Sequence, residues 1–428
     1  MSQAVVLGAG IAGLFAARVL AEAYDRVLII ERDTLDGAMP RRGVPQARHV
    51  HGLMDRGRQI MEELFPGLTA ELAAAGAPVT DVLRGSRWYI AGLRVHPTDT
   101  GLTALLASRP MLEDAILTQV LAMPGVQLWQ RRTAAGLIGD RAVTGVRLAD
   151  GAEVAADLVV DATGRGSRAA DWLAALGHQR PDEERIDVDL GYTSRMFRRK
   201  PDHLDGDLAA VVSTTPGFHG GSAITLEGDR WHVTLSGMLG DHPPTDPVAF
   251  EQFAATLPVP DLYEIVRAAE PLNDPVPHRF RGSLRRRYDR LPAAPRGFLV
   301  LGDAMSSFNP LYAQGMTVAA QQALALRECL PDPVPAQFYR RAAVPIEIAW
   351  QMSTQADLRF PGVEGRRSLR GRIVGAYTSR IPMAAHHDAE VARAFMRTAN
   401  LTAPPTSLLA PAIALRVLRA SSSERSTR

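Results

Sequence analysis

The sequence of 428 residues is poor in lysine and in cysteine. Lys200 is its one lysine among 48 lysine and arginine residues, and the setting Arg198–Pro201 is neither that of a phosphate-binding P-loop nor that of a pyridoxal Schiff base. Cys329 is the one cysteine, so an intrachain disulfide and a cysteine-rich metal site are both excluded. Cys329 lies at the apolar end of a helix pattern, where we expect it to pack in the core.

A strong charge of one sign and long hydrophobic runs are also missing. The 46 acidic residues nearly balance the 48 basic ones, so we expect no nucleic-acid partner. No stretch reaches the roughly 20 uninterrupted apolar residues of a membrane-spanning helix, and no basic segment precedes the apolar start. We therefore expect a cytoplasmic protein. The arginine-rich stretch 366–372 is interpreted as a solvated helix face, with peripheral membrane contact as the alternative.

A glycine-rich turn near the N-terminus separates two apolar strand patterns. Strand, turn, helix and strand follow one another within about thirty residues, at 4–7, 8–13, 14–23 and 26–30. Gly8 permits a tight turn, Gly10 lets a pyrophosphate approach the backbone, and Gly13 lets the helix pack closely on the strand. Glu31, about 20 residues further on, can accept hydrogen bonds from a ribose. The unit predicts dinucleotide binding.

Two later segments favour FAD over a nicotinamide as the resident dinucleotide. Residues 157–164 form an apolar strand pattern that ends in a glycine turn, and residues 297–304 form another that ends in Gly302-Asp303. Asp303 can then face a ribityl or ribose hydroxyl of a long cofactor. The helix that begins after residues 309–315 offers its N-terminal N–H groups to the negative edge of a reduced flavin.

In this order, the motifs resemble those of the group A flavin-dependent monooxygenases of the p-hydroxybenzoate hydroxylase superfamily. The stretches 41–51 and 308–318 are most similar to bacterial polyether-type and squalene-type epoxidases. In that family FAD binds in an extended form, and an arginine that leads into a helix touches it. The resemblance implies these cofactor-binding residues: Gly8, Gly10, Gly13, Glu31, Arg32, Arg42, Arg109, Asp303, Pro310, Gly315 and Met316.

The sequence departs from the family pattern at two positions. Thr163 stands in the middle motif where relatives carry the acid of an Asp-Gly pair, a motif that the family associates with NADPH contact. Ala313 stands where many relatives carry glycine. If this position requires a positive φ, alanine costs about 1 kcal/mol or more there. We expect a flavin pocket of altered shape.

The expected fold is α/β, with a Rossmann-like FAD-binding domain, an inserted and mainly antiparallel β-sheet substrate domain, and a C-terminal helical region. Alternating strand patterns separated by turns predict the sheet. The limits are 1–180 and 284–330 for the two parts of the FAD-binding domain, 181–283 for the sheet and 331–428 for the helices. The substrate-pocket candidates, for which packing in the core is the alternative, are Tyr192, Phe197, Trp231, Met238, Phe308 and Tyr312.

The resemblance implies a monooxygenase that inserts one oxygen atom of O₂ into a small hydrophobic organic substrate through a C4a-hydroperoxyflavin. NADPH or NADH would be the transient reductant, with a separate reductase as a possible partner. The expected reaction is epoxidation or hydroxylation in natural-product biosynthesis. Since the flavin carries the reaction, no side chain is assigned as catalytic.

Other activities and sites remain open at this level. The alternatives are a reductase or desaturase of the geranylgeranyl reductase type, a non-redox FAD-requiring cyclase and, more weakly, a halogenase. No metal site is expected, because neither His49-Val50-His51 nor His386-His387-Asp388 has the spacing of a metal motif. No G-x-S-x-G motif supports a hydrolase.

Overall fold

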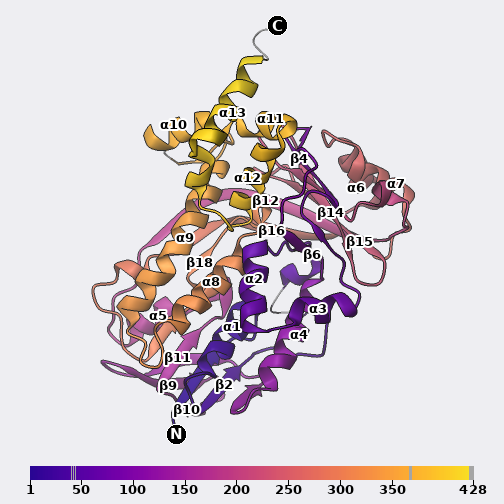
Figure 1. Ribbon diagram of the computed structural model, residues 1–428. Helices are drawn as coiled ribbons and strands as arrows, with labels where there is room; N and C mark the ends of the chain where they lie inside the picture. The colour runs from indigo at the N-terminus through magenta and orange to yellow at the C-terminus, as the bar shows by residue number, and fades with distance from the viewer. Residues whose placement is uncertain (40, 42, 44, 366–368, 424–428) are drawn as a thin grey trace.

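The computed structural model describes residues 1–423 apart from 40, 42, 44 and 366–368 (Figure 1). It confirms the expected mixed α/β fold. Figure 1 shows the N-terminal strands at one end of the molecule, the large sheet in the middle and the last helices at the other end.

A five-stranded parallel sheet forms the first layer, in the order β17-β11-β1-β2-β7. Its strands are nearly continuous runs of buried apolar residues, as a parallel sheet covered on both faces requires. Strands β1, β11 and β17 run side by side, so the loops that follow them meet at one edge of the sheet. The strands are β1 (Gln3–Leu7), β2 (Arg26–Ile30), β7 (Val126–Trp129), β11 (Leu158–Asp161) and β17 (Phe298–Val300).

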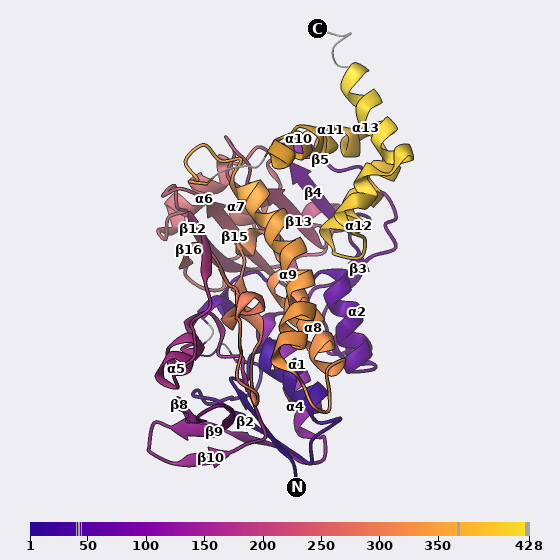
Figure 2. The same cartoon turned by 90° about the vertical axis from the view of Figure 1, so that its left-hand side faces the viewer.

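Helices cover one face of this sheet, and a small antiparallel sheet lies against it as well. Helix α1 packs against α8, and α8 packs against α2 and α9, as Figure 2 shows for the stacked helices. The small sheet, in the order β10-β9-β8, contacts β11. These elements are α1 (Ile11–Leu20), α2 (Asp55–Leu64), α8 (Gly315–Arg327), α9 (Pro335–Asp357), β8 (Ala134–Gly139), β9 (Val143–Leu148) and β10 (Glu153–Ala155).

An eight-stranded, mostly antiparallel sheet forms the second layer, in the order β18-β16-β12-β15-β14-β13-β4-β5. Strands β4 and β5 come from before residue 181 and β18 from after residue 283, so this sheet recruits chain from both sides of the segment in which it was expected. The strands are β4 (Ser86–Ile90), β5 (Leu93–Arg94), β12 (Glu183–Arg198), β13 (Ala209–Ser213), β14 (Gly220–Leu226), β15 (Arg230–Gly237), β16 (Val276–Arg286) and β18 (Ser306–Ser307).

The two faces of the large sheet have different neighbours. One face packs under α6 and α7 around the fully buried side chains of Trp231 and Phe250. The other face meets the 310–312 turn and the chain after α9, where Tyr192 and Phe280 pack with Phe360. The remaining elements of the first 270 residues are α3 (Leu68–Ala74), β3 (Val79–Asp81), β6 (Thr103–Leu105), α4 (Arg109–Leu121), α5 (Ala169–Ala175), α6 (Pro247–Ala255) and α7 (Asp261–Ala268).

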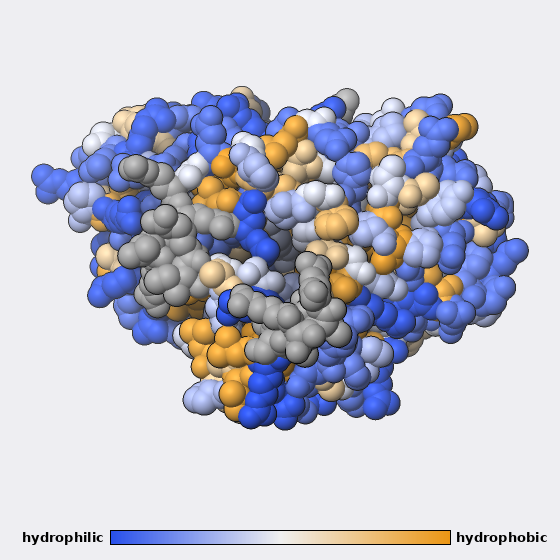
Figure 3. Space-filling view, turned by 90° about the horizontal axis from the view of Figure 1, so that it is seen from above, coloured by the Kyte–Doolittle hydropathy of each residue, from blue (hydrophilic) through white to orange (hydrophobic). Residues whose placement is uncertain are grey.

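The C-terminal region is helical and packs on the segment around β4 and β5. Val82 and Val95 share a core there with Ile381 and Met396. Figure 3, which views this end of the molecule, shows hydrophobic patches interspersed with hydrophilic side chains. The helices are α10 (Leu369–Thr378), α11 (Ile381–His387), α12 (Ala389–Ala399) and α13 (Pro411–Ser423).

Two expectations about membranes and thiols can be placed in this fold. No helix within residues 1–365 and 369–423 is both long enough and apolar enough to cross a bilayer. The side chains of 366–372 lie outside the described residues, so peripheral membrane contact there stays a prediction. Cys329 is buried, as expected.

Candidate functional site

The glycine-rich turn follows β1 at the edge where the parallel strands end. Gly8 has a φ of +96°, and a Cβ on it would lie 2.8 Å from the Ala162 carbonyl oxygen. A Cβ on Gly13 would lie 1.9 Å from the Gly8 carbonyl oxygen. Gly10 differs, because the nearest atom to its Cβ would be Arg41 Nη2, 4.0 Å away. The fold itself therefore requires Gly8 and Gly13, whereas the space in front of Gly10 is open to a ligand.

Two arginines and two carboxylates form a connected group beside this turn. Glu31 Oε2 accepts a 2.7 Å hydrogen bond from the Ala9 N–H and lies 3.3 Å from Arg41 Nη1. Arg41 Nη2 donates to the Ala9 carbonyl at 2.8 Å and to Glu113 Oε2 at 2.9 Å. Arg109 Nε donates to Glu113 Oε1 at 2.9 Å. The group brings together Glu31 and Arg109, two of the residues predicted to bind the cofactor.

Arg41 is a member of this group that sequence reasoning missed. The signal was the pair Arg41-Arg42, from which Arg42 was chosen, and Arg42 lies outside the described residues. Arg32 is exposed and its Nη2 lies 3.5 Å from the Gly43 carbonyl oxygen, so it faces the following loop. A small cavity of about 30 Å³ adjoins the group and is lined by Ala9 and Arg41, among others.

Asp303 lies in the turn Gly302–Ala304 that follows β17, at the same edge of the sheet. A Cβ on Gly315, the first residue of α8, would lie 3.8 Å from Asp303 Oδ1, so the carboxylate faces the start of that helix. Burial raises the pKa of Asp303, and the nearby positive charges of Arg109 and Arg165 partly offset that effect. The turn, Arg41, Arg109 and the start of α8 thus converge on one region, in which the carboxylates of Glu31, Glu113 and Asp303 lie among arginine side chains.

Two buried oxygen atoms at the start of α8 have no hydrogen-bond partner among the described residues. They are Gln314 Oε1 and Thr317 Oγ1. A buried polar atom without a partner costs roughly 1–3 kcal/mol, so a polar ligand at this helix start would relieve the cost. Met316, which stands between Gln314 and Thr317 in the sequence, is also buried. Pro310 is exposed at the start of the preceding turn.

These observations fit FAD as the group held at this edge of the sheet. The open face of Gly10 and the N-terminus of α1 suit a diphosphate, which also finds positive charge on Arg41. Asp303 suits a hydroxyl of the ribityl chain, and the unpartnered oxygen of Gln314 suits an N–H group of a flavin ring, whereas the Thr317 hydroxyl faces Gly57 of α2. The assignment of these residues to the cofactor remains a proposal.

The departure at Thr163 has a structural explanation. The Thr163 hydroxyl donates to Asp161 Oδ1 at 2.6 Å, and the Ser167 hydroxyl donates to Asp161 Oδ2 at 2.6 Å. Asp161 is fully buried at the end of β11, and burial raises its pKa. Thr163 therefore helps to satisfy a buried carboxyl group of the sheet edge.

The departure at Ala313 has the conformation that the sequence argument anticipated. Ala313 has φ 52° and ψ 26°, the left-handed region in which alanine is strained. It ends the Pro310–Tyr312 turn just before α8. A Cβ on Gly52 would lie only 2.7 Å from the Ala313 Cβ, so the added methyl group is accommodated by the absence of a side chain opposite it.

A buried carboxyl group holds the turn before α8. Asp357, the last residue of α9, accepts hydrogen bonds through Oδ1 from Asn309 Nδ2 and from the Tyr312 hydroxyl, both at 2.8 Å. Its Oδ2 is buried without a partner among the described residues. Burial raises the pKa of Asp357 to about 6, although the two hydrogen bonds act in the opposite direction.

The structure separates the substrate-pocket candidates into different places. Tyr192 and Met238 are buried together on the face of the large sheet that meets the turn at 310–312. Phe197 and Trp231 lie on the opposite face, in the core under α6 and α7. Side chains alternate between faces along a strand, so Tyr192 and Phe197 of β12 cannot line one surface. The other two candidates are Phe308, in the core of the first layer, and Tyr312, in the turn held by Asp357.

A group of rings on the Tyr192 face was not found from the sequence. His49, Tyr192 and His278 pack together, with ring centroids 4.7 Å apart for His49 and Tyr192 and 5.0 Å apart for Tyr192 and His278. The sequence signal was His49-Val50-His51, for which a metal site was rejected in favour of surface or pocket-lining histidines, without a prediction of their partners. In the part of the chain that the structure describes, no cluster of three or more metal-binding side chains occurs.

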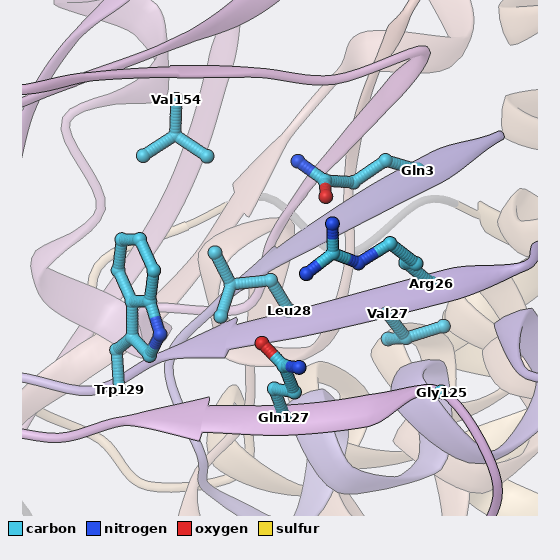
Figure 4. Close-up of a pocket in the computed structure, with 8 residues that line it drawn as sticks. All are labelled: Gln3, Arg26, Val27, Leu28, Gly125, Gln127, Trp129 and Val154. Atoms are coloured by element: carbon cyan, nitrogen blue, oxygen red, sulfur yellow. The ribbon is translucent and has the colours of Figure 1, made fainter. Parts of the chain in front are cut away.

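A larger hollow lies elsewhere, between the parallel sheet and the small antiparallel sheet (Figure 4). Its volume is about 250 Å³, and its lining includes Arg26, Trp129 and Val154. Gln3 and Arg26 are the first residues of β1 and β2, whereas the glycine-rich turn follows the last residue of β1. The hollow is therefore separate from the site described above.

Comparisons with known proteins show the family of the chain. The family model "FAD dependent oxidoreductase" matches residues 3–270. Protein Rv3254 of Mycobacterium tuberculosis is 34% identical over 425 residues, which cover 93% of this chain and 89% of that protein.

Two solved structures show the same fold at low sequence identity. PqsL from Pseudomonas aeruginosa, described as a probable FAD-dependent monooxygenase, has a TM-score of 0.64 at 18% identity over 91% of this chain and 98% of that chain. The Diels-Alderase PyrE3 of pyrroindomycin biosynthesis has a TM-score of 0.63 at 17% identity over 94% of this chain and 80% of that chain. With the family model covering more than half of its length, the chain belongs to the FAD-dependent oxidoreductase family.

Proposed function

We propose that this oxidoreductase is a monooxygenase that uses FAD, O₂ and NADPH or NADH to oxygenate a small hydrophobic organic substrate. The observation that carries the proposal is the convergence of three features: the open glycine turn, Asp303 at the start of α8, and the sheet face that bears Tyr192. Arg165, in the turn after β11, lies 4.3 Å from the ring centre of Phe280, which packs with Tyr192, and this turn contacts the one that holds Asp303, so the cofactor region and the sheet face adjoin.

The protein's part in such a reaction is to bind, orient and exclude water. When bound, FAD supplies hydride acceptance and reaction with O₂. The guanidinium groups of Arg41 and Arg109, which Glu31 and Glu113 hold in place, would bind its diphosphate end, and the N–H groups at the start of α8 would stabilise negative charge on the ring. Tyr192 and Met238 offer an apolar wall to the substrate, which keeps water from the reacting atoms.

Epoxidation of an alkene in natural-product biosynthesis is the finer proposal, with hydroxylation as its rival. The similarity of stretches 41–51 and 308–318 to polyether-type and squalene-type epoxidases supports it. PqsL, described as a monooxygenase, supports the broader class through its fold alone.

Reduction by a nicotinamide followed by O₂ consumption tests the proposal. The purified FAD-bound protein is mixed with NADPH or NADH without oxygen, and the absorbance of oxidised flavin is followed before and after O₂ is admitted. We expect loss of that absorbance, and then its return with consumption of O₂. Flavin that neither nicotinamide reduces, while dithionite does, would move the reductant to a separate reductase. If flavin reduced by dithionite does not react with O₂, the monooxygenase proposal fails.

A non-redox cyclase is the second candidate, favoured by the likeness to PyrE3, which is described as a Diels-Alderase. In that case FAD shapes the site and no electrons are transferred. The rate of product formation from a polyene would then be equal with oxidised and with reduced flavin. A monooxygenase instead requires the reduced flavin and O₂.

A further inference from the structure

A series of hydrogen bonds links His49 to two strands of the large sheet. His49 Nδ1 lies 2.8 Å from Ser194 Oγ in β12, and Ser194 Oγ lies 2.6 Å from Thr234 Oγ1 in β15. The backbone N–H of Val50 donates to Thr234 Oγ1 at 3.3 Å. Ser194 and Thr234 are directly paired across the two strands, so the register of the sheet fixes the positions of both hydroxyl groups.

The donor and the acceptor of each hydrogen bond follow from the bond that Val50 makes. An amide N–H only donates, so Thr234 Oγ1 accepts from Val50. Among the described residues the Thr234 hydroxyl proton has one acceptor in reach, Ser194 Oγ, and the Ser194 proton then has His49 Nδ1. If Nδ1 accepts, a neutral imidazole carries its proton on Nε2.

Burial keeps the His49 ring neutral. Its side chain is 3% exposed, and burial lowers its pKa to about 3, with the positive charges of neighbouring groups acting in the same direction. A neutral ring with Nδ1 occupied has one hydrogen-bonding function left, the Nε2–H donor. Within the described part of the chain, no acceptor for this N–H and no partner for the Tyr192 hydroxyl occurs at hydrogen-bond distance.

We propose that His49 is a fixed hydrogen-bond donor that orients the organic substrate by an acceptor oxygen, through its Nε2–H. The inference rests on the proposed function, because it places the substrate against the Tyr192 face. The chemical class that fits is a molecule with a carbonyl or similar electron-rich oxygen at one end of an apolar body. A substrate group that can only donate hydrogen bonds is disfavoured by the same geometry.

The tautomer of His49 is the first test, and it needs no activity. Nitrogen NMR of the FAD-bound protein labelled with ¹⁵N-histidine distinguishes Nε2–H, Nδ1–H and imidazolium, and the His49 signal is assigned by its loss in His49→Gln. We expect neutral Nε2–H at pH 7. In Thr234→Val, Ser194 no longer accepts a hydrogen bond from residue 234, so its hydroxyl can either donate to His49 or accept from it. A mixture of the two His49 tautomers should then appear. Thr225→Val is the matched control, since it removes a buried hydroxyl without a partner from neighbouring β14.

The class of ligand is the second test, made with two probes of the same shape. Acetophenone has a carbonyl oxygen where α-methylstyrene has a CH₂ group, and their binding to the FAD-bound protein is read from changes in flavin absorbance. We expect acetophenone to bind about tenfold more tightly, the factor that corresponds to about 1.4 kcal/mol. The preference should disappear in His49→Phe and persist in His49→Gln, whose amide N–H replaces Nε2–H.

Each outcome has one meaning. An Nδ1–H tautomer, an imidazolium at pH 7, or equal affinity for the two probes (including no binding of either) overturns the inference. A preference for acetophenone that survives in His49→Phe overturns it as well. Failure of the proposed function gives a different result. A reduced flavin that does not react with O₂ contradicts the monooxygenase proposal, whereas the tautomer of His49 and the preference for acetophenone are then still observed.

Discussion

At the scale of single residues, Ala313 and Gly52 form a coupled pair at the turn before α8. Ala313 accepts a left-handed conformation, and its methyl group occupies the space that a side chain at position 52 would need. The departure from glycine at 313 is thus tolerated because position 52 has no side chain. The two positions lie far apart in the sequence, so their interaction cannot be recognised from either stretch alone.

A double-mutant cycle should show this coupling. Gly52→Ala alone is expected to lower the free energy of unfolding by about 1–3 kcal/mol, because two methyl groups would overlap. Ala313→Gly alone should change it by less than about 1 kcal/mol, since relief of strain is offset by the freedom of glycine in the unfolded chain. In the double variant most of the loss should be recovered. Urea unfolding measures all four proteins, and purely additive effects would contradict the contact.

Asp357 gives a prediction about pH. Burial raises the pKa of Asp357 from its ordinary value of 3.8 to about 6, so between these values the folded state binds more protons than the unfolded state. Stability contributed by this group is therefore present at low pH and lost as pH rises through about 6. A raised pKa of this size corresponds to a loss of about 3 kcal/mol at most.

Asp357→Asn should remove this pH dependence. The amide keeps an oxygen that accepts from Asn309 and Tyr312 and carries no charge to bury. Urea unfolding at pH 4.5 and pH 7.5 compares the two proteins: the stability of the variant relative to wild type should rise between them. A constant difference would show that Asp357 does not titrate in this range.

At the scale of elements, the junction of β1 and α1 separates what the fold needs from what a ligand needs. Gly13 touches backbone, whereas Gly10 faces open space bounded by the end of the Arg41 side chain. The motif pattern treats the glycines alike, and only the packed helix distinguishes them.

Gly10→Ala and Gly13→Ala should therefore fail in different ways. Gly13→Ala would place a methyl group 1.9 Å from the Gly8 carbonyl oxygen, so we expect the free energy of unfolding of the apoprotein to fall by about 1–3 kcal/mol or more. Gly10→Ala should change the free energy of unfolding of the apoprotein by less than about 0.5 kcal/mol. It should weaken FAD binding at least tenfold, since the added methyl group would meet the diphosphate. Urea unfolding and FAD titration give both values. Unchanged FAD affinity in Gly10→Ala would contradict this placement of the cofactor.

At the scale of the whole molecule, Arg87 ties a distant part of the chain to the large sheet. It lies on β4 and its guanidinium is bonded to Asp207 and Asp261, both at 2.8 Å, and to Asp205 at 2.7 Å. Its side chain is only 13% exposed. Because Asp205 and Asp207 lie just before β13 and Asp261 begins α7, these bonds fasten the N-terminal strand β4 to segments that come much later in the chain.

Removal of this charge should be costly. Arg87→Met is expected to lower the free energy of unfolding by about 3–5 kcal/mol, because the buried carboxylate of Asp261 and the half-buried carboxylate of Asp207 lose their partner. Arg84→Met is the matched control: Arg84 lies 3.9 Å from Asp99 in an exposed pair, and its loss should cost less than about 1 kcal/mol. Urea unfolding compares both with wild type. Similar small effects for the two variants would show that Arg87 does not hold the segments together.

What the sequence by itself determined was local. Strand, glycine turn and helix at residues 4–23, the strand that precedes Gly302-Asp303 and the strain expected at Ala313 all follow from neighbouring residues, because turn geometry and burial pattern are set within a few positions of the chain. These signals predicted the fold class and the edge of the sheet at which the candidate site lies.

Only the tertiary structure decided which distant residues meet. Strand pairing placed β4 and β5 in the large sheet, and the packing of α6 and α7 buried the face that bears Phe197. The tertiary structure also brought Arg41 to Glu31 and Glu113, and His49 to Ser194. Such contacts depend on register and on packing between segments far apart in the chain, which alternation within one strand does not encode.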